Sequence, residues 1–204
     1  MIGMYVEMTE KRRYTMGIRG EQLEATRRQI IEATVELHRT VGPAGTQISE
    51  IARRAGVQRV TIYNHFPDDA LLLAACSAHW RTLHPTPDLT AWRAVAEPSR
   101  RLRLGLGELY AWYRETEPMT ANVLRDAETV PALGPIIERG LGAYLEAARR
   151  VLSDDFQAGG RLPDRLQAAV RVAVDFHAWR ALAGLGDPEA ADLAASFVEL
   201  AANT

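Results

Sequence analysis

Apolar residues recur every three or four positions along most of this chain. This spacing places apolar side chains on one face of an α-helix, whereas a half-buried strand would alternate strictly between apolar and polar residues. The first helical segment carries its apolar face from Leu23 to Val41. It ends at residues 42–45, because glycine and proline are the strongest local helix breakers. No segment alternates over more than a few residues, so the pattern predicts an all-α protein.

Further helices are predicted wherever the same spacing lies between two breakers. Asp68 follows a Phe-Pro pair and has the side chain expected at the N-cap of a helix. The two prolines within residues 84–88 indicate a hinge between a small N-terminal module and a larger C-terminal helical bundle. The expected helices span residues 48–55, 59–65, 69–84, 89–96, 98–116, 118–128, 133–153, 162–184 and 188–202.

The composition narrows the class of protein. With 204 residues, of which 47% are hydrophobic and 25% charged, the chain matches a soluble globular protein. It contains no run of about 18 uncharged apolar residues and no secretory signal, so no membrane partner is expected. A single cysteine, Cys76, excludes an internal disulfide and indicates a reducing, cytoplasmic compartment. Residues 1–66 hold ten Lys and Arg against seven Asp and Glu, which is compatible with binding a polyanion there.

The segment from Thr46 to Asp69 meets the steric demands of a helix-turn-helix. Gly56 is able to adopt the positive φ that the sharp turn requires, and Ala52 is small where the second helix passes close by. The apolar positions that would close the small core are Ile48, Ile51, Val57, Ile62 and Phe66. An arbitrary helical hairpin with similar breakers is the alternative interpretation.

The second helix of this motif lies in the major groove of DNA, with its first residues at the base edges. Arg59 stands at the start of that helix, and its two donors match O6 and N7 of guanine. Thr61 is a candidate for contact with a thymine methyl group or a phosphate. We therefore predict that Arg59 is the main base-reading residue.

Phosphate contacts are expected from two neighbouring places. Tyr63, Asn64 and His65 lie on the far side of the second helix of the motif. Thr46 and Gln47 lie at the start of the preceding helix, where free amides and the positive end of the helix dipole suit a phosphate. Each of these residues taken singly is also compatible with a plain surface or core position.

At these residues the chain resembles the tetracycline-repressor (TetR) family. The matching motif is formed by Thr46, Ile51-Ala52, Ala55-Gly56-Val57, Thr61-Ile62-Tyr63, His65-Phe66 and Asp68, within a similarity that covers residues 22–80. The resemblance implies a homodimer on a palindromic operator in double-stranded DNA, with an effector pocket in the C-terminal bundle. It also implies a flexible extension at 1–20, a DNA-binding domain at 21–68 and an effector and dimerisation domain at 69–204.

Two positions depart from the family pattern. Asp69 stands where family members often carry a lysine that meets a phosphate, and this acid would repel the DNA backbone. Gln58 replaces the small hydroxyl residue that is common at the start of the recognition helix. A basic run, Lys11-Arg12-Arg13, is a candidate DNA-backbone arm that would compensate, and a disordered, solvated tail is the alternative.

The C-terminal bundle carries candidate residues for an effector and for a dimer. Ligand sites are mostly apolar with a few placed polar groups, so we expect a small apolar or amphipathic effector. The candidate pocket residues are Tyr110, Trp112, Tyr113, Met119, Phe176, His177 and Arg180. The last two helices would form a four-helix interface about a two-fold axis. Its candidate residues are Leu166, Val170, Val174, Leu193 and Phe197. Aromatic residues at helical spacing are also typical of a plain core.

No enzyme signature accompanies these features. The sequence has no nucleophile elbow, no metal-binding histidine pair, no phosphate-cradling glycine loop and no dinucleotide fingerprint. We therefore expect neither catalysis nor a cofactor or metal. The interpretations that stay open are a ligand-released repressor, a constitutive or protein-controlled regulator or activator, and a helical interaction module that does not bind DNA.

Overall fold

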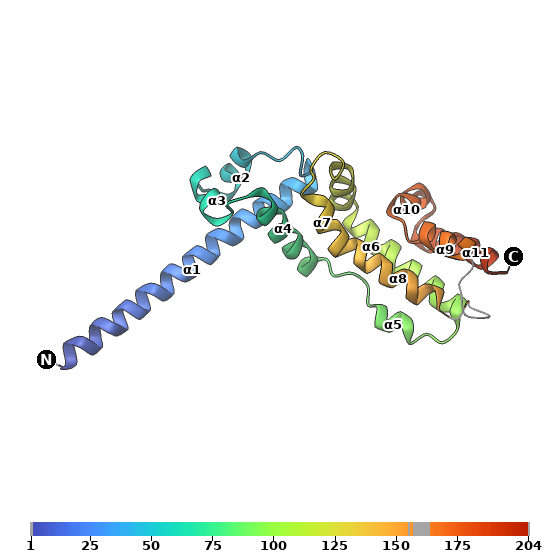
Figure 1. The fold of residues 1–204 in the computed structure, drawn as a ribbon, viewed down its shortest axis with the longest axis horizontal. Helices are drawn as coiled ribbons and strands as arrows, with labels where there is room; N and C mark the ends of the chain where they lie inside the picture. The colour runs from blue at the N-terminus through green and yellow to red at the C-terminus, as the bar shows by residue number, and fades with distance from the viewer. Residues whose placement is uncertain (1, 155, 157–163, 204) are drawn as a thin grey trace. The chain divides into compact units, whose positions relative to one another are not determined.

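The computed structural model describes residues 2–154, 156 and 164–203, and for residues 2–19 it describes the backbone only. Every element within these residues is helical (Figure 1), which confirms the predicted all-α class. None of the described helices is long and apolar enough to cross a bilayer.

The described residues form two compact units. The first contains residues up to Trp80 together with Asn122–Leu133, and the second contains Arg81–Ala121 and the residues from Gly134 onward. The helices that lie mainly in the first unit are α1 (Ile2–Thr40), α2 (Ile48–Ala55), α3 (Arg59–His65) and α4 (Asp69–Leu83). The remaining elements are α5 (Leu89–Arg93), α6 (Pro98–Asp126), α7 (Leu133–Ile137), the π-helical η1 (Glu138–Gly142), α8 (Ala143–Ser153), α9 (Asp164–Ala173), α10 (Phe176–Leu182), the 3₁₀ turn η2 (Ala183–Leu185) and α11 (Asp187–Asn203).

The bounds 21–68 of the DNA-binding domain stay a prediction, and the first compact unit extends beyond them. Most of α4 and the last residues of α6 belong to it. The backbone of α1 is helical from Ile2 onward, whereas the sequence pattern begins its apolar face at Leu23. Flexibility of residues 1–20 stays a prediction, and the side chains of Lys11-Arg12-Arg13 lie outside the described residues.

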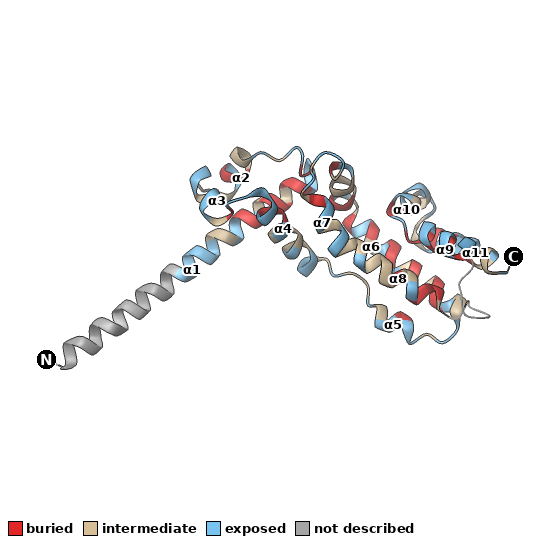
Figure 2. Cartoon of the chain, viewed as in Figure 1, coloured by how far each residue is buried: buried red, intermediate tan, exposed pale blue. Residues whose placement is uncertain are grey.

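Helix α6 corrects one predicted boundary. Residues 98–116 and 118–128 were expected to form two helices separated by Pro118, but α6 continues through Pro118 to Asp126. A proline removes one backbone hydrogen bond and crowds the preceding turn. Buried residues on both sides of it, among them Tyr113 and Met119, hold the helix in register (Figure 2). Packing therefore overrides the local breaker.

The segment 162–184 corrects a second boundary, because it forms two helices rather than one. Asp175 separates α9 from α10, and its carboxylate accepts hydrogen bonds from the backbone N–H groups of His177 and Ala178 at 2.8 and 3.0 Å. These bonds satisfy orphan donors at the start of α10. A strong N-cap within an otherwise helical pattern thus starts a new helix.

Close packing at Gly105 organises the core of the second unit. A Cβ at this position would lie 2.5 Å from Leu152 Cδ2 on α8 and 3.1 Å from the Trp92 ring on α5. Trp92 is fully buried, and its indole N–H donates to Glu108 at 2.6 Å. The absent side chain therefore lets α5 and α8 approach α6 directly. Further along the chain, α9 packs on both α8 and α11.

Candidate nucleic-acid interface

The turn between α2 and α3 has the geometry that the sequence predicts. Gly56 has φ +66°, in the left-handed region, and its backbone N–H donates to the carbonyl of Ala52. The N–H of Val57 donates to the same carbonyl at 3.0 Å. Glycine adopts this conformation without the steric cost that a Cβ imposes. The predicted bounds 48–55 and 59–65 of the two helices are confirmed.

Helix α3 is anchored by its inner face. Ile62 is 1% exposed and Phe66, directly after the helix, is 3% exposed. The Arg27 guanidinium of α1 lies over the Phe66 ring, 4.6 Å from its centroid. Gln58 begins the helix in an extended conformation and makes no side-chain cap hydrogen bond. The departure from a hydroxyl residue at position 58 therefore leaves the start of α3 without a side-chain cap.

Four residues form the outer face of α3. Arg59, Val60, Tyr63 and Asn64 are exposed, whereas Thr61 and His65 are half-buried. At 100° per residue these four positions cover one continuous side of the helix. The structure thus brings the predicted Arg59, Tyr63 and Asn64 together on one surface and places Thr61 and His65 at its flank. Val60, which sequence reasoning passed over, belongs to the same surface.

Arg59 differs from the arginines of α2. Arg53 and Arg54 bond to Glu50 at 2.6 and 3.0 Å, and their hydrogen bonds hold the pKa of Glu50 at about 2. Within the described part of the chain, no hydrogen bond or ion pair engages the Arg59 guanidinium. Its donors are therefore available to an acceptor outside the protein.

Thr46 and Gln47 lie before α2 as predicted. The Thr46 hydroxyl donates to the carbonyl of Gly42 at 2.8 Å, which gives it a role inside the loop. Gln47 is the N-cap residue of α2 and makes no side-chain cap hydrogen bond. Glu50 lies in the first turn of this helix. Its negative charge, although paired with arginines, opposes an anion at this helix start.

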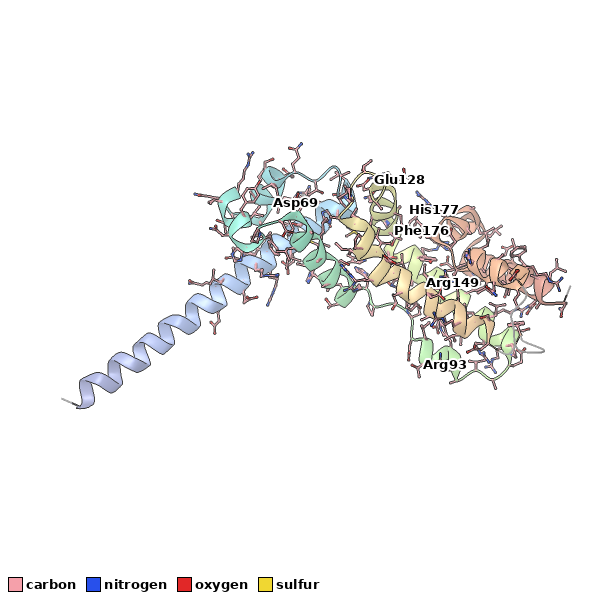
Figure 3. All side chains as sticks on the ribbon, in the orientation of Figure 1. Asp69, Arg93, Glu128, Arg149, Phe176 and His177 are labelled. Atoms are coloured by element: carbon pink, nitrogen blue, oxygen red, sulfur yellow. The ribbon has the colours of Figure 1, made fainter. Side chains whose placement is uncertain are left out.

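The start of α4 carries two acidic residues. Asp68 accepts a hydrogen bond from the backbone N–H of Leu71 at 2.8 Å, which confirms its predicted capping role. Asp69 is the first residue of α4 and is exposed (Figure 3). A carboxylate suits a helix N-terminus but repels a phosphate. Whether Asp69 weakens phosphate binding stays a prediction.

A cluster that the sequence did not reveal holds the loop before α2. We call it the Asp126 clamp; it comprises Asn122, Arg125 and Asp126 at the end of α6. The Asn122 amide donates to the carbonyls of His38 and Arg39, at the end of α1, at 3.0 and 2.9 Å. These bonds cap the carbonyl end of α1, where the carbonyl of His38 also accepts from the N–H of Gly42 at 3.1 Å.

The carboxylate of the clamp binds the loop itself. Asp126 is buried and accepts a hydrogen bond from the backbone N–H of Ala44 at 2.9 Å, and another from Arg125 Nε at 2.7 Å. Burial alone would raise the pKa of Asp126, but these hydrogen bonds outweigh it and hold the pKa below its usual range. A Cβ at Gly42, which has φ +87°, would overlap Asp126 Oδ2 and Arg125 Nη2.

The candidate effector residues fall into two groups. Tyr110, Tyr113, Phe176 and Met119 are buried. The Tyr110 and Tyr113 hydroxyls donate to the carbonyls of Ala173 and Val174 at 2.8 and 2.6 Å. Burial raises the pKa of both tyrosines above their usual value. Together with Phe176 and with Trp179, which is not among the candidates selected from the sequence, the two tyrosines form a packed aromatic cluster.

The other candidates lie at the edge of this cluster. The indole N–H of half-buried Trp112 donates to the carbonyl of His84 at 3.3 Å. His177 is exposed beside Phe176 on α10 (Figure 3). Arg180 is exposed and pairs with Glu117 at 3.1 Å. Their participation in a pocket stays a prediction.

The candidate dimer residues also differ in their exposure. Leu166, Val170 and Val174 are buried within the second unit, whereas Leu193 and Phe197 of α11 are 51% and 50% exposed. Only the α11 pair is therefore accessible to another molecule in the single chain. Among the described residues, no cluster of His, Cys, Asp and Glu is arranged to hold a metal ion.

Comparison with known proteins identifies the DNA-binding part. The family model of bacterial regulatory proteins of the tetR family matches residues 30–76. The HTH-type transcriptional regulator SrpR of Pseudomonas putida is 38% identical over a segment covering 36% of this chain and 38% of SrpR. The chain thus spans well under two thirds of that relative's length in the match. The family and this relative are transcriptional regulators, in agreement with the prediction that the protein is not an enzyme.

Solved structures share the fold over most of the chain. A protein described as a TetR-family transcriptional regulator from Mesorhizobium loti has a TM-score of 0.60 and 20% identity, covering 88% of this chain and 96% of its own. The protein RolR, solved in complex with the ligand resorcinol, has a TM-score of 0.52 and 22% identity, covering 89% of each chain. These likenesses confirm an N-terminal helix-turn-helix domain followed by a helical bundle.

Proposed function

Since residues 30–76 match the family model of the tetR bacterial regulatory proteins, we propose that the chain is a homodimeric repressor of this family that a small-molecule effector releases from a palindromic DNA operator. The observation that carries the proposal is the outer face of α3, where Arg59 has no protein partner among the described residues. A helix-turn-helix presents this face to the major groove, and an unpaired arginine there suits guanine O6 and N7.

A homodimer is supported by the exposed side of α11. Leu193, Phe197 and Leu200 follow one another at helical spacing and are all at least half exposed. Apolar side chains gathered on one helix face mark a protein interface more often than scattered ones do. Pairing of this face about a two-fold axis would supply two recognition helices, as a palindromic operator requires.

An effector is supported by the second unit and by one structural neighbour. RolR was solved with resorcinol bound, and the second unit of this chain contains the aromatic cluster around Tyr113 and Phe176. Helices α4 and α6 each run from one unit into the other. An effector that prefers one arrangement of these helices would shift the population of DNA-competent dimers.

A constitutive or protein-controlled regulator is the second candidate. It is favoured by the hydrogen bonds that the Tyr110 and Tyr113 hydroxyls already make to backbone carbonyls. These two groups are satisfied without a ligand, so they function as core residues in the chain as it stands. Titration of the operator complex with resorcinol and other small phenols separates the two candidates, because only a ligand-released repressor would dissociate.

Selection of duplexes from a random pool, at a fixed salt concentration, tests the proposed sequence-specific DNA binding. We expect the protein to enrich a palindrome and Arg59→Ala to lose the preference at one position of each half-site. Arg93→Ala is the matched control, because it removes an exposed arginine of the second unit. A pool that shows no enrichment with the wild-type protein would contradict sequence-specific binding.

The dimer is tested by sedimentation velocity. Phe197→Glu places a charge on the exposed face of α11 and is expected to give a monomer with unchanged helical content. If the variant sediments as the wild type does, the interface lies elsewhere.

A further inference from the structure

Val60 is an exposed apolar residue among polar neighbours. It is 57% exposed in the first turn of α3, whereas Ile62 of the same helix is 1% exposed. Its neighbours on the outer face are Arg59, Tyr63 and Asn64. A single exposed valine is common on protein surfaces and needs no explanation. Val60 differs from such a residue because it lies on the surface that we assign to base contact.

The chemistry of the side chain restricts what it is able to recognise. Valine carries only methyl groups, so it neither donates nor accepts a hydrogen bond. Phosphates and most major-groove base atoms are polar, and the C5-methyl group of thymine is the apolar feature of that groove. Guanine, by contrast, presents two acceptors that suit Arg59. A valine in the groove therefore favours thymine.

We propose that Val60 contacts the C5-methyl group of a thymine in each operator half-site, next to the base pair that Arg59 reads. This inference rests on the proposed DNA-binding function and adds a specific base to it. Arg59 and Val60 are consecutive residues, so their side chains leave the helix one after the other along its outer face. They contact neighbouring positions of the groove, Arg59 by hydrogen bonds and Val60 by an apolar contact.

The test uses the duplex enriched by selection. Each thymine is replaced in turn by deoxyuridine, which removes the C5-methyl group and nothing else, and affinity is measured by fluorescence anisotropy. Replacement of one symmetric pair of thymines is expected to weaken wild-type binding about fourfold per half-site, which is the effect of exposing one buried methyl group. The Val60→Ala variant retains a single methyl group closer to the helix, and it is expected to lose most of this sensitivity to deoxyuridine.

Two controls keep the result interpretable. Leu83→Ala truncates an equally exposed side chain, 57%, outside the helix-turn-helix, and it should keep the wild-type sensitivity to deoxyuridine. Thermal unfolding of Val60→Ala should match the wild type, because little surface is buried at this position. An enriched duplex with no deoxyuridine-sensitive thymine would overturn the inference alone, as would full sensitivity in Val60→Ala. Failure to enrich any duplex would overturn the proposed function and this inference together.

Discussion

Replacing Gly42 by alanine tests whether Asp126 holds the loop before α2. The backbone of Gly42 is in the left-handed region, with φ +87°, which costs an alanine about 1 kcal/mol or somewhat more. The added Cβ would also overlap the Asp126 carboxylate and the Arg125 guanidinium. Asp126 would have to leave the N–H of Ala44, and a hydrogen bond to a charged group contributes about 1.5–3 kcal/mol. The expected loss in the free energy of unfolding is therefore about 2.5–5 kcal/mol.

Gly56→Ala is the matched control for this prediction. Gly56 also has a positive φ, +66°, but no described atom lies within 4 Å of a Cβ built there. Only the backbone cost of about 1 kcal/mol applies. A second control combines Gly42→Ala with Asp126→Ala. Without the carboxylate, the exposed Arg125 side chain loses its ion pair and is free to move away from the added Cβ, so the added cost of the alanine should fall to the value seen at position 56.

Urea unfolding followed by circular dichroism measures all of these variants. The slope of the free energy against urea must stay constant for the comparison to hold. If Gly42→Ala costs no more than Gly56→Ala, the loop is not held against Asp126 and the clamp has no role in stability.

Three further predictions follow from buried groups. Burial lowers the pKa of His38 from 6.5 to about 4, although the charge of Asp126 opposes this shift. The unfolded chain therefore binds a proton that the folded protein excludes. Stability should accordingly fall as the pH drops from about 6.5 to 4, by at most about 1.4 kcal/mol per pH unit. A His38→Gln variant whose stability, measured by urea unfolding, falls as steeply with pH as that of the wild type would refute this. Gly105→Ala should destabilise the protein by about 1–3 kcal/mol through overpacking against Trp92, and an unchanged unfolding midpoint would contradict the close approach. Tyr113→Phe should cost about 1 kcal/mol in thermal unfolding, because the buried carbonyl of Val174 loses its donor, and a neutral effect would show that water replaces the hydroxyl.

The helix-turn-helix is the part of the fold that local sequence determines most completely. Its bounds depend on Gly56 at the turn and on Ile51 and Ile62 facing inward, and both are local steric requirements. Arg59 likewise follows from its position at the start of a helix. These features lie within a few residues of one another, so a reading of the sequence finds them without tertiary information.

Other features depend on contacts between distant residues. Pro118 is a strong local breaker, yet packing on both sides keeps α6 continuous. The bond from Ala44 to Asp126 joins residues 82 positions apart, and nothing in the neighbourhood of Asp126 marks it as a partner of the loop. Val60 did have a local signal: it is an apolar residue of α3 that lies off the spacing of the buried positions. The exposure of Val60 in the folded protein shows that it is not a core residue.

Sequence-specific binding through Arg59 is tested by comparing the affinities for the selected palindrome and for a shuffled duplex at one stated salt concentration. The wild-type protein is expected to prefer the palindrome by about a thousandfold or more. Arg59→Ala is expected to lose about 1–3 kcal/mol of that preference, while Arg93→Ala retains it. Equal affinity of the wild-type protein for the two duplexes, or an undiminished preference in Arg59→Ala, would show that binding is not sequence-specific through this helix.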